Sequence, residues 1–298
     1  MNILTEQEEH IIIHKGTEMP HTGEYRDLSA DGMYICRQCE SPLYTSDSKF
    51  QSTCGWPSFD DAIPGKVLMQ PDADNRRTEI ICKTCWGHLG HVFVGEQQTE
   101  KSVRHCVNSL SMLFIEKEKI TDSITSQIPQ VEVAYLWGGC FWCIEGPLAQ
   151  VPGVIEIRSG YMGGKRPFPT YERVTTGVSG YIEIVQVFYE PQKLTYTQLL
   201  WYFFAIHDPR SYDQQGNDKG SQYRSAIFTT SDNQECTAHE VIGKLESWGE
   251  PLVTQVKPAE TFYLAEDYHQ NFYANNPTKP YCQLVVQPKI EKIQKLLS

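Results

Sequence analysis

Two C-x-x-C pairs in the first third of the chain constrain its fold more than any other feature. They are Cys36 with Cys39 and Cys82 with Cys85, separated by 42 residues. Four thiolates at this spacing form a closed tetrahedral zinc site without an open position for a substrate. We therefore expect one structural Zn²⁺ that holds together two distant hairpins of a larger sheet. The alternative is a redox pair or four buried thiols.

The length of the chain favours two domains. At 298 residues and 34.1 kDa it exceeds the usual size of a single domain. A polar stretch that leads into a proline predicts a linker over residues 119–130, between domains at 1–118 and 131–298. Short apolar runs between turn residues predict a mainly β first domain, a sheet domain stapled by the zinc.

The second domain is predicted to be α+β, in two layers. Strand patterns cover residues 131–137, 181–189 and 223–230, and helical patterns cover residues 140–150 and 196–207. A further helix is predicted to open at Ser231, where Gln234 completes a capping box. Cys236, inside that helix, is expected to be a buried structural thiol.

Composition narrows the possible environments and partners. The N-terminal sequence is acidic and polar, and the longest apolar stretch, residues 199–206, falls far short of the roughly 18 residues of a membrane helix. We expect a cytoplasmic monomer whose ten cysteines stay reduced, several of them as metal ligands or catalysts. The net charge is −11, and neither half has the basic footprint of a nucleic-acid binder.

Two further cysteines have surroundings that suit a nucleophile. Cys106 stands in R-H-C-V-N-S and Cys140 in G-G-C-F-W-C. The order strand, Gly-Gly, Cys140 places that thiol at a helix N-terminus, where unpaired N–H groups favour the thiolate. Two nucleophilic cysteines in different settings suggest two active sites on one chain.

A set of motifs covers nearly all of residues 5–117. These are Gly16-Thr17-Glu18, Thr22-Gly23-Glu24-Tyr25, both C-x-x-C pairs, C-G-W-P-S-F from Cys54, His88-Leu89-Gly90-His91-Val92-Phe93 and R-H-C-V-N-S. With them the first half resembles the B-type peptide methionine sulfoxide reductases. The resemblance implies that Cys106 is the nucleophile and Cys54 the resolving thiol. It also implies a substrate pocket made by Trp56, His88, His91 and Asn108.

Those residue types suit the chemistry. A thiolate that attacks a sulfoxide sulfur becomes a sulfenic acid, which a second thiol converts to a disulfide. The departing oxygen needs a proton, and a histidine can supply one near neutral pH. Metal ligation or loop packing is the alternative for both histidines, and core packing is the alternative for Trp56.

Other motifs run from about residue 132 to 288. They are Gly138-Gly139-Cys140-Phe141-Trp142, Ser159-Gly160-Tyr161-Met162-Gly163-Gly164, Pro169-Thr170-Tyr171, His207-Asp208-Pro209, Gly216-Asn217-Asp218, Gln222-Tyr223-Arg224-Ser225 and Ala265-Glu266-Asp267-Tyr268-His269-Gln270. This half resembles the A-type peptide methionine sulfoxide reductases. The resemblance implies that Cys140 attacks and Glu183 protonates the sulfoxide oxygen. Tyr171 and Tyr223 would donate hydrogen bonds to that oxygen, and Asp218 would help to order the site.

Other residues of the second half leave alternatives open. Phe141 and Trp142 could form an apolar wall for the substrate methyl group or pack beneath the helix. The usual G-H-x-E segment has Tyr181 in place of histidine, so we expect the hydrogen bonding around the acid to differ. Either Cys143 or Cys282 could close the first disulfide. We favour Cys282, because C-x-x-C along one helix needs a distorted turn, and Cys143 then serves as relay or packing.

Together these features predict a bifunctional enzyme that reduces free or protein-bound methionine sulfoxide. By resemblance, the N-terminal half takes the R epimer and the C-terminal half the S epimer, since this repair uses one enzyme type per epimer. Each cycle ends in a disulfide, which implies thioredoxin or a similar dithiol reductant and no organic cofactor. The alternatives are a zinc-stapled interaction module fused to a thiol redox sensor, and a cysteine peroxidase.

Overall fold

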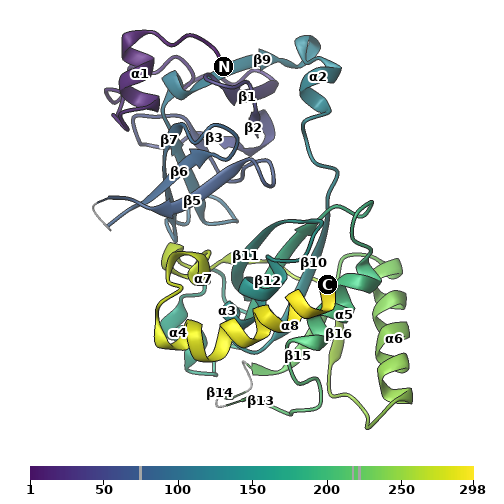
Figure 1. Ribbon diagram of the computed structural model, residues 1–298. Helices are drawn as coiled ribbons and strands as arrows, with labels where there is room; N and C mark the ends of the chain where they lie inside the picture. Colours follow the sequence, from purple (N-terminus) through teal and green to yellow (C-terminus); the bar gives the residue numbers. More distant parts are fainter. Residues whose placement is uncertain (74–75, 217, 221–222) are drawn as a thin grey trace. The chain divides into compact units, whose positions relative to one another are not determined.

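The computed structural model divides into two compact units, Met1–Pro129 and Gln130–Ser298. It describes residues 1–73, 76–216, 218–220 and 223–298. Two motif residues named above, Asn217 and Gln222, lie outside the described residues. Each unit has its own sheets and its own buried side chains, and each is described by itself below (Figure 1).

Unit 1 consists mainly of short strands, as the turn-rich sequence predicts. Its elements are α1 (Glu6–Ile12), β1 (Gly32–Cys36), β2 (Pro42–Thr45), β3 (Lys49–Phe50), β4 (Ser58–Phe59), β5 (Val67–Pro71), β6 (Thr78–Cys82), β7 (His88–Val94), β8 (Val103–Val107), β9 (Met112–Glu116) and α2 (Asp122–Thr125). The strands form two antiparallel sheets, in the orders β2-β1-β9 and β3-β4-β8-β7-β6-β5.

Aromatic rings join the two sheets of unit 1. Tyr34 of β1 meets Phe59 of β4 edge-on, with ring centroids 4.9 Å apart, and Tyr44 of β2 stacks on Phe59 at 4.3 Å. All three side chains are fully buried. Such pairs each add about 0.5–1.5 kcal/mol beyond the area they bury. They fix β4, which pairs directly with the strand that carries Cys106.

Unit 1 contains two short helices that the sequence analysis did not predict. Helix α1 begins with a capping box, in which Thr5 Oγ1 accepts from Glu8 N at 3.3 Å and Glu8 Oε2 accepts from Thr5 N at 2.8 Å. That signal is present in the sequence, but seven residues are too few for a helical period. Helix α2 lies within the segment expected to be a linker. Isoleucines of this segment, Ile120, Ile124 and Ile128, pack against Met33, Ile35 and Ile63.

Unit 2 combines one mixed sheet with helices. Its elements are β10 (Glu132–Gly138), α3 (Trp142–Leu148), β11 (Val154–Met162), α4 (Tyr171–Thr175), β12 (Ile182–Tyr189), α5 (Tyr196–Ala205), β13 (Gln214–Gln215), β14 (Asp218–Lys219), β15 (Ser225–Thr229), α6 (Asp232–Ser247), β16 (Gln255–Pro258), β17 (Tyr263–Leu264), α7 (Phe272–Asn275), a π-helical turn (Cys282–Val286) and α8 (Gln287–Leu297). The sheet order is β16-β15-β10-β12-β11-β17, and only β15 and β16 pair in parallel among the described strands.

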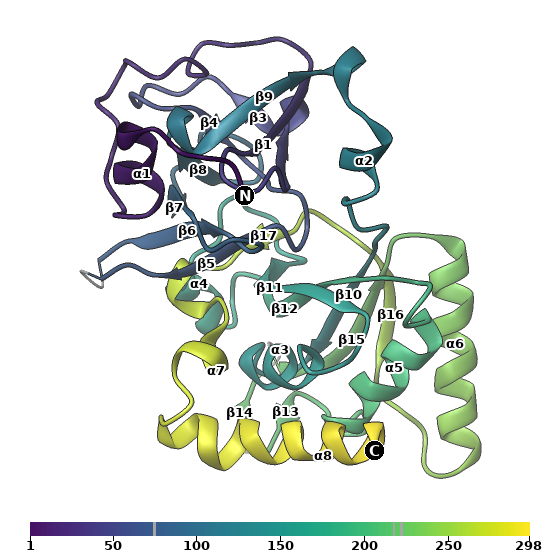
Figure 2. The same cartoon turned by 45° about the horizontal axis from the view of Figure 1, so that its top comes forward.

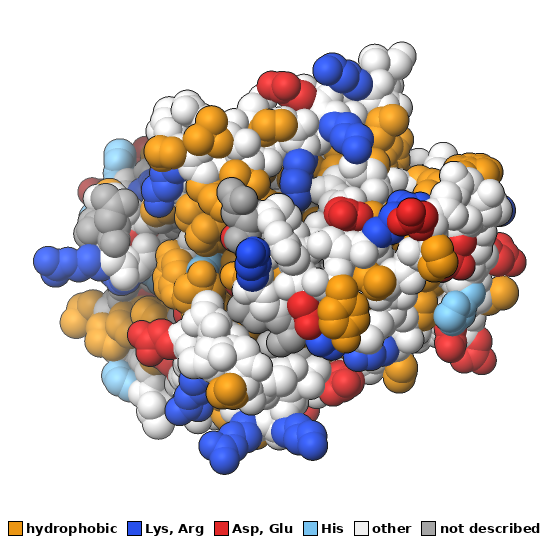
Figure 3. Space-filling model, turned by 90° about the horizontal axis from the view of Figure 1, so that it is seen from below, with side chains coloured by type: hydrophobic (Ala, Val, Ile, Leu, Met, Phe, Trp, Pro, Cys, Tyr) orange, Lys and Arg blue, Asp and Glu red, His pale blue; other side chains and the backbone are white. Residues whose placement is uncertain are grey.

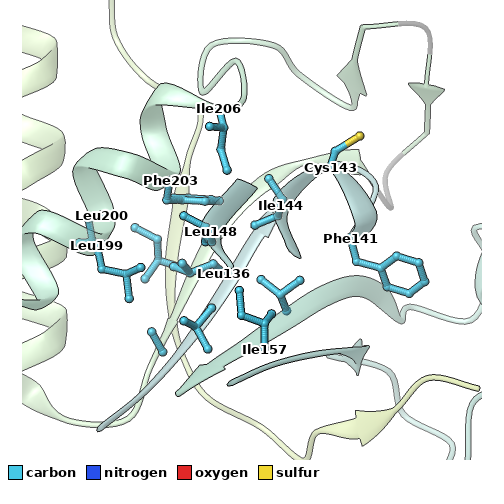
Figure 4. Packing of buried hydrophobic residues seen from close by; sticks show 14 of the residues in the cluster. Leu136, Phe141, Cys143, Ile144, Leu148, Ile157, Leu199, Leu200, Phe203 and Ile206 are labelled. Carbon is cyan, nitrogen blue, oxygen red and sulfur yellow. The ribbon is translucent and has the colours of Figure 1, made fainter. Parts of the chain in front are cut away.

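The sheet of unit 2 is apolar on both faces. Along β10, Ala134 and Leu136 face one cluster, whereas Tyr135 and Trp137 face the other, as the alternation of a strand requires. The first cluster is covered by α3, α5 and α8, and Figure 2 shows α5 and α6 side by side. Figure 4 shows Cys143 at the edge of this cluster, with its sulfur pointing away from Ile144.

The expectation for Cys236 is wrong. Its side chain is exposed, and its sulfur contacts Glu240 Oε1 at 3.8 Å. Helix α6 buries the face that carries Gln234, Ala238 and Val241. Cys236 is two residues from Gln234 and two from Ala238, and two residues correspond to about 200° around a helix. Its side chain therefore lies on the opposite face of α6, which is exposed to solvent.

The surface carries charges of both signs. On the face drawn in Figure 3, basic and acidic side chains are interspersed, and apolar side chains lie among them both singly and in groups. Among the described residues, no helix is long and apolar enough to span a bilayer.

Candidate active sites

The four cysteines of the two C-x-x-C pairs lie together in unit 1. Cys36 and Cys82 end β1 and β6, and each is followed by the same tight turn. The carbonyl of Cys36 accepts from Glu40 N and that of Cys82 accepts from Trp86 N, both at 2.8 Å. Glu40 and Trp86 both have positive φ, 60° and 65°. Each C-x-x-C pair thus lies in an equivalent turn, and each turn contributes two sulfurs to the cluster.

The cluster fits zinc. The Sγ atoms of Cys36 and Cys85, and those of Cys39 and Cys82, are 3.6 Å apart, and all four sulfurs lie within 4.8 Å of one another. Sulfurs at 2.3 Å around a tetrahedral Zn²⁺ are about 3.8 Å apart. Because β1 and β6 belong to different sheets, the metal would join two sheets rather than two hairpins of one.

The expected nucleophile and resolving thiol of unit 1 lie in contact. Cys106 is on β8, directly opposite Ser58 of β4, and Cys54 precedes β4 in the connecting loop. Their sulfurs are 3.9 Å apart. Both side chains are partly exposed, so a substrate can reach them.

The electrostatics of this pair favour one thiolate. The hydrogen bond with Cys106 lowers the pKa of Cys54 to about 4, and hydroxyl groups of Ser52 and Ser58 act in the same direction. The same contact raises the pKa of Cys106, against the neighbouring guanidinium of Arg104. Arg104 is held by Glu96 at 2.6 and 2.8 Å. In the resting pair the negative charge therefore lies on Cys54.

A β-bulge brings His88 and His91 together. The pairing between β6 and β7 shifts by one residue next to Gly90, and the two imidazole rings consequently lie 5.5 Å apart. A Cβ at Gly90 would lie 2.0 Å from the carbonyl oxygen of Cys106, so only glycine fits. His91 is directly opposite Cys106 across the β7–β8 ladder.

Carboxylates orient both rings. His88 Nδ1 is 2.7 Å from Glu79 Oε1, and His91 Nε2 is 2.8 Å from Asp72 Oδ2. A carboxylate accepts, so each of these ring nitrogens carries a proton. Burial lowers the pKa of His88, against the opposing bond to Glu79. Nε2 of His88 is buried and has no partner among the described residues.

Trp56 and Asn108 have structural partners. Trp56 Nε1 donates to the Glu18 carbonyl at 2.9 Å, and Asn108 Oδ1 accepts from Glu18 N at 3.0 Å. Asn108 also donates to Leu89 O at 3.1 Å. Both residues thus fix the segment around Glu18 beside the Cys54 loop, while a contact with substrate stays a prediction.

Cys140 of unit 2 lies in the turn between β10 and α3. Helix α3 begins at Trp142 with Phe141 as N-cap, two residues later than expected, so Cys140 precedes the helix. The Cys140 carbonyl accepts from Cys143 N at 2.9 Å. Gly139 has φ +96°, and a Cβ there would lie 2.8 Å from the side chain of Gln215.

The thiol that contacts Cys140 is Cys143. Their hydrogen bond raises the pKa of Cys140 well above its usual range and lowers the pKa of Cys143 to about 7. The Tyr281 hydroxyl lies 3.1 Å from the Cys143 sulfur and 3.5 Å from Asp218 Oδ2. Cys282 is fully buried where the π-helical turn begins, and burial raises its pKa.

An acid and two phenols surround Cys140. Burial raises the pKa of Glu183 to about 8, so this carboxyl is mostly protonated at neutral pH. Its Oε2 accepts from Phe141 N at 3.2 Å. Burial is the largest cause that raises the pKa of Tyr171 to about 12, and the charges of Glu183 and Cys140 act in the same direction. Burial followed by Glu183 also raises the pKa of Tyr223, so both phenols are donors.

Aromatic side chains form one side of this site. Phe141 is buried and lies 4.8 Å from the His269 ring, while Trp142 stacks on Phe272 at 3.6 Å. Tyr171 lies 4.6 Å from His269. The Trp142 indole is only partly buried, which leaves both packing and substrate contact open for it.

Tyr181 does not bond to the acid in this structure. Its hydroxyl donates to the Arg166 carbonyl at 2.6 Å, and its ring occupies the space above Gly164. The only described protein group that binds a Glu183 oxygen is the amide of Phe141. The replacement of histidine by tyrosine therefore stabilises the loop before β12.

Three residues that contact site groups were missed by sequence reasoning. Arg104 stands in the R-H-C-V-N-S motif and Tyr281 directly precedes Cys282, so the signal was available. Glu79 lies in a strand without any motif. Its pairing with His88 depends on the register between β6 and β7, which sequence alone does not show.

A thiol pair in each of two different folds is the arrangement of a thiol-dependent oxidoreductase. A family model described as peptide methionine sulfoxide reductase matches residues 132–297, and a SelR domain model matches residues 4–116. The chain belongs to the peptide methionine sulfoxide reductase family, with a SelR domain in front of the domain that gives the family its name.

Individual relatives cover a little more than half of the chain. The peptide methionine sulfoxide reductase MsrA of Polynucleobacter asymbioticus is 46% identical over 179 residues, which cover 59% of this chain and 93% of the relative. That of Sulfolobus acidocaldarius is 49% identical over 166 residues, covering 55% and 94%. The reduced form of Mxr1 from Saccharomyces cerevisiae is a structural neighbour with TM-score 0.49 and 32% identity, covering 51% of this chain and 89% of that chain.

Proposed function

We propose that both units reduce methionine sulfoxide, free or in proteins, the first unit acting on the R epimer and the second on the S epimer. The observation that carries the proposal is a thiol pair in each unit beside a group able to protonate an oxygen. Family membership supports the substrate. The epimer assignment rests on the resemblance of each unit and on the rule of one enzyme type per epimer.

In unit 2, Cys140 is the nucleophile and Glu183 the acid. After the Cys140 proton has passed to the Cys143 thiolate, the Cys140 sulfur attacks the sulfoxide sulfur while the oxygen takes the Glu183 proton. The S–O bond and the new S–S bond then break as the hydroxyl group passes to the Cys140 sulfur, and methionine leaves with a sulfenic acid on Cys140. A carboxyl with a pKa of about 8 holds that proton at neutral pH. Tyr171 and Tyr223 donate to the oxygen, and Phe141 with Trp142 receives the methyl group.

Cys143 is the better candidate for the first disulfide of unit 2. Its thiol contacts Cys140, and its lowered pKa supplies a thiolate near neutral pH. The objection to a C-x-x-C bond within one helix is weakened, because Cys140 precedes the N-cap. Cys282 then takes a later step, in which the disulfide is passed to the C-terminal segment.

In unit 1, Cys106 attacks and Cys54 resolves. The proton shared by the two thiols must move to Cys54 for Cys106 to become the nucleophile, and their 3.9 Å contact allows that transfer. His91, opposite Cys106, is the candidate proton donor, with His88 beside it. Cys36, Cys39, Cys82 and Cys85 would hold a structural Zn²⁺.

Recycling of both units needs a dithiol reductant, for which thioredoxin is the proposed partner. A disulfide accepts two electrons from a dithiol through a mixed disulfide, so the partner must reach a sulfur of each pair.

The test uses purified R and S epimers of a methionine sulfoxide derivative with dithiothreitol as reductant. Cys106→Ser should abolish only R-epimer reduction, and Cys140→Ser only S-epimer reduction. Undiminished turnover in either variant would refute that assignment. A redox sensor would instead show stable thiol oxidation without turnover, and a peroxidase would consume hydrogen peroxide catalytically.

A further inference from the structure

The sulfur of Cys54 is surrounded by hydroxyl groups. Ser52 Oγ lies 2.9 Å from the Cys54 sulfur, and Ser58 Oγ lies 3.3 Å from it. The two hydroxyls are also 2.7 Å from each other. Ser58 is fixed by the β4–β8 ladder directly opposite Cys106. One of the two hydroxyls is therefore held by the sheet, and the other, of Ser52, by the loop before β4.

We propose that Ser52 and Ser58 are positioning residues that favour the thiolate form of Cys54 when it resolves the sulfenic acid of Cys106, the proton that Cys54 gained in the first step passing to the departing oxygen. This inference rests on the proposed function of unit 1. In the resolving step, the Cys54 thiolate attacks the Cys106 sulfur, an S–S bond forms and the S–O bond breaks. The oxygen leaves as hydroxide and takes up one proton to become water.

The serines matter at that step because the Cys106 thiol no longer stabilises the Cys54 thiolate. In the reduced pair, the Cys106 thiol is the largest cause of the low pKa of Cys54, followed by burial, which opposes it, and then by the two hydroxyls. Once Cys106 is oxidised, its S–H is no longer available as a donor. The hydroxyls of Ser52 and Ser58 then stabilise the Cys54 thiolate, whereas burial favours the neutral thiol.

Charged groups near Cys54 come from two other segments. Arg26 Nε donates to the Cys54 carbonyl at 3.5 Å, and Arg104 on β8 is affected by the charges of Cys54 and Cys106. Both guanidinium groups favour a thiolate and are unchanged by substitution of the serines. The serine variants therefore measure the contribution of the hydroxyls alone.

The experiment uses the full-length chain with Cys140→Ser, so that only unit 1 reacts, and one equivalent of the R epimer without reductant. Rapid quenching and mass spectrometry follow Cys106 sulfenic acid, trapped by dimedone, and the Cys54–Cys106 disulfide. With Ser52→Ala plus Ser58→Ala, we expect disulfide closure at pH 7 to slow about 10-fold or more, since hydrogen bonds to charged groups are the stronger ones. The first turnover should still form one equivalent of methionine per chain. Raising the pH to 9 should restore closure.

Two controls separate the possible failures. Ser52→Thr keeps a hydroxyl and should close at the rate of the parent chain, and Thr53→Ala removes an exposed hydroxyl from the same loop without effect. In a Cys106→Ala chain, alkylation of the Cys54 peptide against pH should show its pKa raised by about two units when both serines are replaced. Unslowed closure at pH 7 in the double variant would overturn the inference. Absence of methionine from the parent chain would instead overturn the function of unit 1.

Discussion

The two units meet the same chemical demand with different protein groups. In unit 1 the proton for the departing oxygen would come from an imidazole oriented by a carboxylate, on a sheet tied by four cysteines. In unit 2 it would come from a carboxyl that burial keeps protonated, with a pKa of about 8. The imidazole depends on a carboxylate that orients it, whereas the carboxyl depends on a dry environment.

The thiol pairs show a related difference. Both expected nucleophiles have a raised pKa and a partner with a lowered one, but the partner is held by serine hydroxyls in unit 1 and by the Tyr281 hydroxyl in unit 2. Cys54 reaches Cys106 from a separate loop, whereas Cys143 is three residues from Cys140. Unit 1 therefore depends on tertiary structure to bring its thiols together.

The largest effect should come from removing the metal. Chelation, or Cys82→Ser, should unfold unit 1 and abolish R-epimer turnover, because a structural zinc contributes as much free energy as the whole stability of a domain. S-epimer turnover should be unchanged. Turnover of both epimers and the zinc content per chain are the measurements. Cys236→Ser, at an exposed cysteine, is the matched control. Retained R-epimer turnover after chelation would show that the cluster is dispensable.

Replacing the acid of unit 2 should have the next largest effect. Glu183→Gln should lower kcat for the S epimer about 10²- to 10⁴-fold and leave the R epimer untouched. Because the raised pKa is about 8, the wild-type acid is protonated below that pH, and S-epimer turnover should fall as the pH rises through it.

The corresponding control is Glu240→Gln, which removes an exposed carboxylate from α6. A pH profile for the R epimer with the same alkaline limb would mean that the limb belongs to the assay or to a shared step rather than to Glu183. The contrast between the two proton donors would then lose its support.

Backbone packing is the third point of comparison. Gly90→Ala should destabilise unit 1 by about 3 kcal/mol, because its Cβ would meet the Cys106 carbonyl at 2.0 Å and φ is +154°. Gly243→Ala in α6 meets nothing within 4 Å and should stabilise unit 2 by about 1 kcal/mol. Thermal unfolding of the two variants measures both changes. Equal stability of Gly90→Ala and wild type would show that β7 can move away from β8 at little cost.

The sequence predicted what depends on short-range chemistry. Spacing alone indicated the four-cysteine cluster, and alternation with turn residues indicated the strand β12 and the helix α5 close to their observed bounds. The capping residue Ser231 also marks the start of α6. There the side chain of Gln234 does not close a reciprocal box, but binds Thr230 N and Val133 O instead.

What the sequence could not show depends on register and on which face is buried. The pairing of Glu79 with His88 needs a bulge in the antiparallel ladder between β6 and β7, and no local pattern encodes that shift. Cys236 was expected to be buried because cysteines usually are, yet its position on α6 faces solvent. The sequence also left open where α3 begins, on which the proposal of Cys143 rather than Cys282 rests.

The smallest effect should be at Tyr181, and it tests whether the acid of unit 2 is isolated from its neighbouring loop. Tyr181→Phe removes the 2.6 Å bond to the Arg166 carbonyl and should destabilise unit 2 by about 1 kcal/mol. Its kcat for the S epimer and the alkaline limb near pH 8 should stay as in wild type, because this hydroxyl bonds to a backbone carbonyl and not to Glu183. Tyr223→Phe, which removes a phenol beside the acid, should lower kcat about 10-fold. If Tyr181→Phe moves the limb, the loop and the acid are coupled, and burial alone does not set the protonation of Glu183.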